Sequence, residues 1–311
     1  FGDGTDIKAH PKNNLPVGSG PYKVVSFNPR EAIVLERHPG YFFKDRPQFE
    51  RVIFRMIPDN AAQALALEKG EVDLLPGSVT LSQFSQLSKA KDVVLSRKGG
   101  EAIGPLGWLA FNLKRKPFDD VRVRQALTLA IDRWGGSASL GKISLIKGVS
   151  GMFRPGSPYG LPAAELEQIP GFWKDIEKSR AEARRLLKEA GHENLKFKLL
   201  NRQLGQPFQP AGLYAVDQWK RIGLQVEHLE IETSPYFQAI ESGNFDVGVN
   251  NISDFADDPS AQFNTQVSLK ASSIGYSRHS DTRLDELFFA QSREVDPVKR
   301  MTLVHEFERR G

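Results

Sequence analysis

The fold is decided by residues 108–133, which read WLAFNLKRKPFDDVRVRQALTLAIDR. The largely apolar residues 108–113 predict a strand, and a charged turn follows it. Asp119 and Asp120 then offer an N-cap to a helix predicted over 121–131, where their negative charge suits the positive end of the helix dipole. A strand joined to a helix by a short turn is typical of an α/β arrangement.

The chain that follows this segment alternates helices with strands. Predicted helices cover 179–190, 213–222 and 234–241, and predicted strands cover 195–200, 224–231 and 245–249. The first of these helices has the clearest pattern, because its apolar residues form one stripe and Gly191 ends it. This alternation predicts α/β lobes.

The first hundred residues predict shorter elements. They are a hairpin over 22–27 and 32–36, a strand within 48–57, a helix over 61–69 and a strand over 72–75. The pattern of helix, Gly, any residue, apolar, Asp, apolar occurs at 67–74 and again at 240–247. It is typical of a duplicated α/β unit and equally of a common helix-to-strand turn, and both interpretations stay open.

The composition is that of an ordinary globular protein. The 311 residues carry 42 Lys and Arg against 38 Asp and Glu, with the two signs interspersed, so no nucleic-acid partner is expected. The chain has no cysteine, which excludes a disulfide framework and a thiol nucleophile. Its length favours two lobes, and its apolar runs are too short to cross a bilayer.

Catalytic and metal-binding patterns are missing from the sequence. Residues 136–143 match a phosphate-binding loop until Ile143, which stands where a Ser or Thr must reach magnesium. The six histidines have no metal-ligand spacing, and Ser19 lacks the Gly-x-Ser-x-Gly pattern of a nucleophile elbow. We therefore expect no enzyme activity, no metal site and no cofactor.

Two charged features are candidates for ligand binding. Residues 254–259, Asp-Phe-Ala-Asp-Asp-Pro, follow a predicted strand and place three carboxylates and a ring in one loop, which suits a cationic group. Arg202 follows the predicted strand 195–200 and can grip a carboxylate at two points. A solvated acidic turn and a surface arginine are the alternatives for these two features.

Several ordered segments resemble one family, the bacterial extracellular solute-binding proteins of family 5, which serve peptide and nickel ABC importers. They include the dipeptide- and oligopeptide-binding type. The resemblance is carried by residues 16–22 (PVGSGPY), 33–41 (IVLERHPGY), 66–73 (ALEKGEVD), 109–113 (LAFNL), 117–127 (PFDDVRVRQAL), 130–133 (AIDR) and 155–158 (PGSP). It extends through the helix ending at Gly191 to Tyr276 and Ser277, and so covers nearly the whole chain.

The resemblance implies a mixed α/β, two-lobe periplasmic binding-protein fold of type II, the large peptide-binding type, present in part. Residues 1–104 would be part of the first lobe and residues 105–311 the large second lobe. The family has a section before and a stretch after the segments matched here, so we expect a fragment lacking the N-terminal section and the C-terminal end.

The resemblance also implies capture of a ligand, without catalysis. The lobes would close on a small ligand, a peptide first of all, and deliver it to ABC permease subunits in the inner membrane for transmembrane transport. A monomer is expected, located in the periplasm, or extracellular and lipid-anchored in a Gram-positive source.

In peptide-binding members an aspartate in an Asp-aromatic-x-acidic-Pro loop holds the ligand's ammonium, and an arginine holds its carboxylate. Asp254 and Arg202 stand at those places in this sequence. The loop is one residue longer here than in the family, which leaves Asp257 and Asp258 open as the relevant carboxylate.

The predicted site also includes two aromatic residues, and the sequence differs from the family at one further place. Phe255 and Trp108 are predicted walls for the ligand, with core packing as the alternative for Trp108. Gly135 and Gly136 stand where the family continues a helix, and they predict an altered loop without an assigned role.

Two other functions stay open at this point. Family members that bind nickel chelates, haem, opines or sugars make a non-peptide ligand the first alternative. A hydrolase is the second, and the missing nucleophile motif disfavours it.

Overall fold

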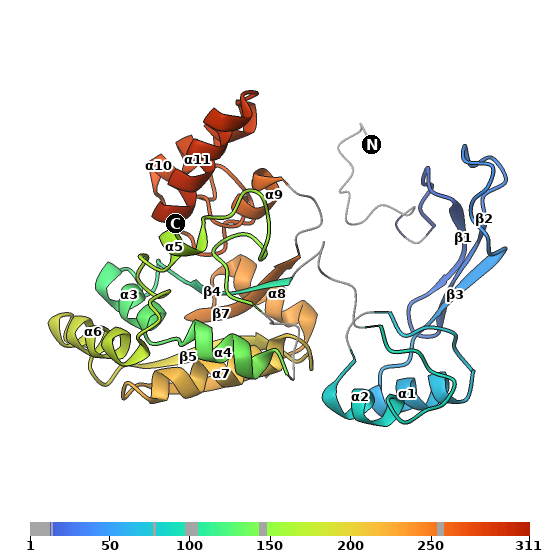
Figure 1. The fold of residues 1–311 in the computed structure, drawn as a ribbon, viewed down its shortest axis with the longest axis horizontal. Coiled ribbons are helices and arrows are strands. Elements are labelled where there is room, and N and C mark those ends of the chain that lie inside the picture. The colour runs from blue at the N-terminus through green and yellow to red at the C-terminus, as the bar shows by residue number, and fades with distance from the viewer. Residues whose placement is uncertain (1–12, 14, 77–78, 97–104, 143–147, 254–257) are drawn as a thin grey trace. The chain divides into compact units, whose positions relative to one another are not determined.

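The computed structural model describes residues 13, 15–76, 79–96, 105–142, 148–253 and 258–311 (Figure 1). The chain divides into two compact units, Phe1–Val94 (unit 1) and Leu95–Gly311 (unit 2). Within the described ranges, none of the helices is both long and apolar enough to cross a membrane.

Unit 1 contains a three-stranded antiparallel sheet. Its strands are β1 (Tyr22–Asn28), β2 (Ala32–Arg37) and β3 (Arg51–Arg55), in that order. Two short helices follow, α1 (Asn60–Glu68) and α2 (Leu81–Leu87). The predicted hairpin, the third strand and the first helix are confirmed.

The strand predicted over 72–75 is wrong. These residues form no ladder with any strand in the described part of unit 1, and Leu74 is 72% exposed. An isolated extended segment gains neither ladder hydrogen bonds nor buried side chains, so its apolar residues do not suffice to make a strand. The second copy of the pattern does lead into a strand, through Gly243 at φ 77°.

Unit 2 is built on a four-stranded mixed sheet. In spatial order its strands are β4 (Pro105–Phe111), β7 (Val247–Ser253), β5 (Lys196–Arg202) and β6 (Gln225–Ile231). Strand β5 runs parallel to both β6 and β7, and β4 runs antiparallel to β7. The mixed α/β prediction is confirmed.

Helices cover both faces of this sheet. Helices α3 (Val121–Leu129), α6 (Ile176–Glu189) and α7 (Phe208–Lys220) pack on one face, and α8 (Thr233–Ser242) packs on the other. The predicted caps explain where these helices begin: the side chain of Asp120 accepts from the N–H of Arg122 at the start of α3. The predicted helix over 179–190 corresponds to α6, whose first turn starts three residues earlier.

Trp219 on α7 connects helix α3 with the sheet. Its ring is fully buried and lies 5.1 Å from the ring of Phe197 on β5. Its indole Nε1 donates to the carbonyl of Leu127 on α3 at 2.9 Å. The buried indole thereby keeps its polar atom paired while its apolar surface fills the core.

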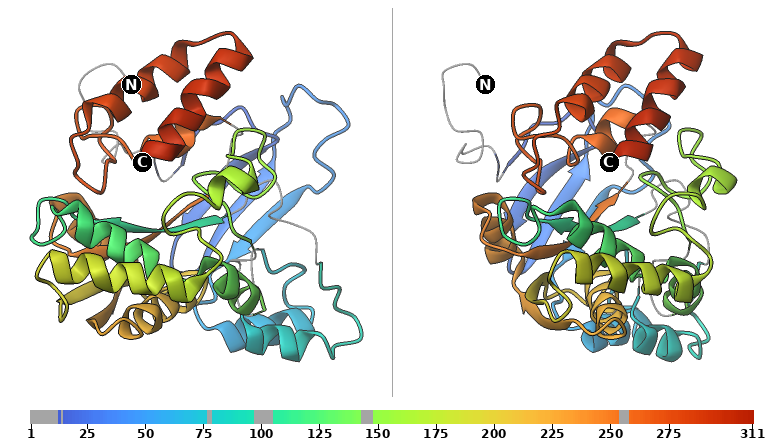
Figure 2. Two further views of the ribbon diagram at one scale, coloured as in Figure 1. Left: turned by 60° about the vertical axis from the view of Figure 1, so that its left-hand side comes forward. Right: turned by 90° about the vertical axis from the view of Figure 1, so that its left-hand side faces the viewer.

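A second helical cluster completes unit 2. Helices α10 (Thr282–Arg293) and α11 (Pro297–Arg310) lie side by side, and α9 (Pro259–Phe263) packs against α10 (Figure 2). At the centre of this cluster the rings of Phe263 and Phe307 stack at 3.7 Å. The short helix α5 (Ala163–Leu166) is joined to α11 by an ion pair between Glu165 and Arg309.

The altered loop predicted at Gly135 and Gly136 is wrong, because both residues lie inside helix α4 (Arg133–Leu140). Asp132 caps this helix by accepting from the N–H of Gly135 at 2.8 Å. At Gly136 an added Cβ would lie 2.7 Å from the ring of Tyr214, whose hydroxyl donates to the carbonyl of Asp132. The second glycine is therefore a packing requirement between α4 and α7.

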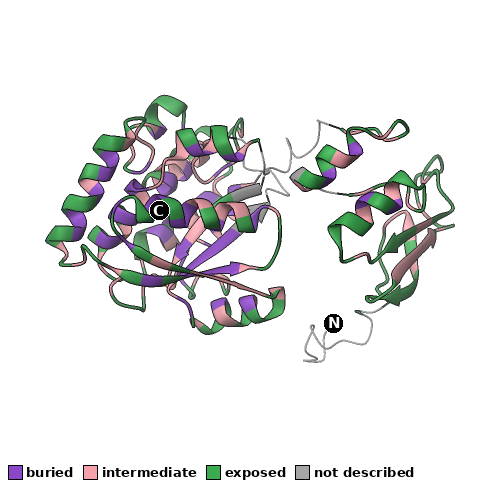
Figure 3. Ribbon diagram, turned by 90° about the horizontal axis from the view of Figure 1, so that it is seen from below, coloured by how far each residue is buried: buried purple, intermediate pink, exposed green. Residues whose placement is uncertain are grey.

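Burial differs strongly between the two units. Among the described residues of unit 1, the buried apolar side chains are Ala64, Ala66 and Leu87, while its sheet leaves Phe27 and Ile53 exposed (Figure 3). In unit 2 the two central strands, β5 and β7, are mostly buried, whereas β6 has only intermediate and exposed residues. Since buried apolar area is the main source of stability, the sheet of unit 1 has little of its own.

We predict that the backbone amides of β1–β3 exchange with deuterium much faster than those of β5. Local opening costs little free energy where few apolar contacts are buried. Hydrogen exchange followed by mass spectrometry on the 311-residue chain measures both sets of amides in one sample. Equal protection of the two sheets would contradict this prediction.

A buried carboxylate fastens a loop to the last helix. Glu308 on α11 is 6% exposed and accepts from the backbone N–H groups of Met152 at 2.7 Å and Leu161 at 2.9 Å. Burial raises the pKa of this carboxyl, although the two backbone donors oppose that shift. The side chain is thus the acceptor for two buried donors that lie far from it in the sequence.

We predict that Glu308→Ala lowers the free energy of unfolding by about 2–4 kcal/mol, because two buried N–H groups lose their acceptor. Glu308→Gln keeps one carbonyl oxygen and is expected to cost less. Glu286→Ala, an exposed position on α10, is the control and should change stability by no more than about 0.5 kcal/mol. Urea unfolding of each variant provides the comparison, and a loss no larger than the control's would refute the role of Glu308.

Candidate functional site

The strand register of the unit 2 sheet brings two of the predicted site residues into one row. Trp108 on β4 lies directly opposite Asn250 on β7. The register of β5 with β7, which pairs Leu200 with Gly248, places Arg202 level with Asn250. With neighbouring strands ~4.8 Å apart, the Cα atoms of Arg202 and Trp108 are ~10 Å apart on the same face.

Aromatic rings from two helices enclose the guanidinium of Arg202. Its central carbon lies 4.6 Å from the ring centre of Phe208 on α7 and 5.3 Å from that of Phe237 on α8. One terminal nitrogen donates to the hydroxyl of Thr233 at 3.1 Å. Cation–π contacts of this kind stabilise a partly desolvated guanidinium.

No carboxylate among the described residues neutralises the positive charge of Arg202. The side chain has no ion pair within that part of the chain, and its Nε is buried without a hydrogen-bond acceptor there. Burial lowers the pKa of Arg202, and nearby Tyr236 opposes this. A held guanidinium with unused donors is suited to an anionic group such as a ligand carboxylate.

Trp108 contributes an aromatic surface with an unused donor. Its ring stacks on that of Tyr276 at 6.2 Å and packs against the apolar cluster under α8. Its indole Nε1 is buried and has no hydrogen-bond partner among the described residues. Trp108 therefore packs on a core, as the alternative interpretation expected, while its role as a wall for the ligand stays a prediction.

The contacts of Arg202 include residues that the sequence pattern missed. The helix predicted over 213–222 begins at Phe208, five residues earlier, so that Phe208 reaches Arg202. Pro207 stands at the N-cap and Pro210 in the first turn of this helix, where proline is tolerated. The alternation of side chains along β5 places Leu200 and Arg202 on one face. This pattern could have indicated from the sequence that Arg202 faces α8.

Asp258, one of the three carboxylates left open by the sequence, has a structural role in the chain. It caps α9 by accepting from the N–H of Ser260, and it pairs with Arg300 on α11 at 2.8 Å. Burial favours the neutral form, but the hydrogen bonds from Arg300 and Ser260 outweigh it and lower the pKa of Asp258. Its negative charge is thus already neutralised within the chain.

The remaining predicted site residues, Asp254, Phe255 and Asp257, lie outside the described residues.

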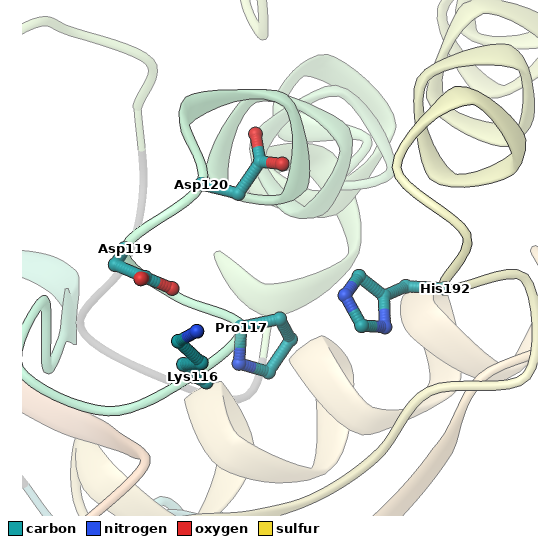
Figure 4. A pocket seen from close by; sticks show the side chains of 5 residues that line it. All are labelled: Lys116, Pro117, Asp119, Asp120 and His192. Carbon is teal, nitrogen blue, oxygen red and sulfur yellow. The ribbon is translucent and has the colours of Figure 1, made fainter.

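A separate hollow of about 570 Å³ lies at the opposite end of β4, lined by Lys116, Pro117, Asp119, Asp120 and His192 (Figure 4). Pro117 and His192 face each other across it. Hydrogen bonds from Arg122 lower the pKa of Asp120 to about 2, and that carboxylate also caps α3. The charge of Asp120 is therefore already paired with Arg122. The hollow is remote from Arg202.

Metal binding has no support in the described part of the chain, where no three His, Asp or Glu side chains gather closely enough to hold an ion.

Comparisons with known proteins agree with the fold and with the resemblance. Residues 3–273 match the family described as bacterial extracellular solute-binding proteins, family 5 Middle. The dipeptide-binding protein of Escherichia coli (strain K12) is 26% identical over 297 residues, which cover 93% of this chain and 52% of that protein. Heme-binding protein A of Haemophilus influenzae is 27% identical over 249 residues, covering 76% and 42%.

Solved structures show the same fold. The periplasmic binding protein DppA from Helicobacter pylori, in complex with the peptide STSA, superposes with a TM-score of 0.77 at 23% identity. The superposition covers 94% of this chain and 55% of that one. This chain spans about half the length of the curated relatives it matches. The predicted two-lobe binding-protein fold, present in part, is confirmed, and the chain belongs to the bacterial extracellular solute-binding proteins of family 5.

Proposed function

We propose that this chain belongs to the substrate-binding component of an ABC importer that captures a peptide. In this proposal residues 1–104 are part of the first lobe and residues 105–311 form the second. The two lobes close around the ligand and then deliver it to membrane permeases, outside the cytoplasm and as a monomer. The family match and the peptide-binding relatives support this function.

The observation that carries the proposal is the environment of Arg202. The guanidinium is fixed by Phe208, Phe237 and Thr233, lacks a carboxylate partner among the described residues, and shares a row with Trp108. A free peptide presents a terminal carboxylate to such a group and apolar side chains to an aromatic wall. In the same proposal Asp254 receives the ligand's ammonium group, a role taken from the family resemblance.

Enzyme activity has no place in this proposal. The guanidinium of Arg202 contacts two aromatic rings and the hydroxyl of Thr233, and these groups do not form a nucleophile and base pair. Binding is therefore the chemistry that this arrangement supports.

We predict that the protein purified from its host without refolding carries a peptide of a few hundred daltons. Native mass spectrometry weighs the complex, and fragmentation of the released ligand should give amino acids. A haem mass, as the relative from Haemophilus influenzae suggests, or a metal chelate would retain the transport role and contradict the peptide.

We predict that Arg202→Ala weakens binding of that peptide by about 2–5 kcal/mol, because a buried charge pair is lost. Calorimetry should compare the free peptide with its C-terminal amide. The unmodified protein is expected to prefer the free acid, while Arg202→Ala should bind both forms equally.

The matched control is Arg221→Ala, at the other end of α7, where the side chain pairs with Asp217. This variant should keep the preference for the free acid. An Arg202→Ala variant that still distinguishes acid from amide would overturn the assignment of Arg202.

A further inference from the structure

The side-chain amide of Asn201 has one allowed orientation. This residue is fully buried at the end of β5, beside Arg202. Its Nδ2 donates to the carbonyl of Phe208 at 2.8 Å, and its Oδ1 accepts from the backbone N–H of Arg202 at 2.9 Å. A flipped amide would place oxygen against oxygen and N–H against N–H, so these two backbone groups fix it.

The fixed amide determines the protonation state of His228. The Nε2 atom of this histidine lies 3.0 Å from Nδ2 of Asn201. Since Nδ2 is a donor only, Nε2 must accept, and an imidazole that accepts at Nε2 is neutral and carries its proton on Nδ1. Asn201 thus joins three elements, because its partners lie on β5, β6 and α7.

Few groups around the His228 ring can titrate. From α7, Gly212 approaches so closely that an added Cβ would lie 2.4 Å from Nε2. From β6 itself comes Glu230, two residues along on the same face, which accepts from Gln209 of α7 at 3.4 Å. Burial lowers the pKa of His228, and Glu230 is the charged group within the described residues that opposes this.

We propose that His228 is a pH-sensitive positioning residue for Arg202, which it holds through Asn201 only while its imidazole is neutral. A proton added at Nε2 faces the N–H of Asn201, so the hydrogen bond becomes a repulsion. The charged ring then has Glu230 as its alternative partner. The link to ligand binding rests on the proposed function of Arg202, whereas the link from His228 to the Arg202 backbone does not.

The sign of the pH dependence follows from the direction of the pKa shift. His228 binds its proton less readily in the folded chain than at the ordinary value of 6.5. The contribution of His228 to this hold is complete at higher pH and is lost as the pH falls through the lowered pKa of the folded state. Acidic conditions therefore loosen the backbone that carries the guanidinium.

The test uses nuclear magnetic resonance on the 311-residue chain with labelled histidine and arginine. At pH 8 the ring of His228, identified by its loss in His228→Gln, should show the Nδ1–H tautomer. On acidification the backbone amide of Arg202 should shift with the same midpoint as that ring. In His228→Gln the side chain keeps an acceptor but does not titrate, and the shift at Arg202 should disappear.

His192→Gln, at the opposite end of the sheet, is the control and should leave the titration of Arg202 unchanged. An Nε2–H tautomer, or a shift at Arg202 that persists in His228→Gln, would overturn the proposal. If His228→Gln does not fold, the tautomer and the shared midpoint in the unmodified chain decide. No ligand is involved, so a failure of peptide binding would remove the proposed function and leave this result standing.

Discussion

The arrangement of unit 2 depends on the burial of β5 between two parallel neighbours. Its ladders to β6 and β7 occupy both sides of its backbone, and helices cover both of its faces. A strand confined in this way cannot slip by one residue without exposing its apolar side chains. The direction of every side chain on β5, including the last two, is therefore determined by the core.

Because side chains alternate along β5, its two last polar residues lie on opposite faces of the sheet. Asn201 points with Leu199 toward α7, and Arg202 points with Leu200 toward α8. Each buried polar group must find a partner, because desolvation without one costs free energy. Asn201 finds its partners within the chain. Arg202 finds aromatic faces and one hydroxyl, and it leaves a donor unused among the described residues.

Sequence patterns predicted the elements whose signals are local, such as the capped helix after Asp120 and the strands around Leu199. They placed Arg202 just beyond a strand ending at residue 200, whereas β5 extends to include it, and its ligand role is still a prediction. They failed where tertiary contacts decide the outcome. The residues 72–75 lack a pairing strand within the described part of unit 1, and helix α4 continues through Gly136, where Tyr214 leaves no room for a Cβ. No local pattern could show that Asn201 and His228, which are far apart in the sequence, share a hydrogen bond.

Strand β6 is the outer strand of the described sheet on its side, so its side chains also affect contacts with other molecules. An outer strand offers unpaired N–H and C=O groups to strands of other molecules. Strand β6 carries two acidic residues, Glu227 and Glu230, and Glu227 is exposed. Glu227 pairs with Lys198 of β5 at 3.5 Å, and charged side chains at an outer strand disfavour edge-to-edge aggregation.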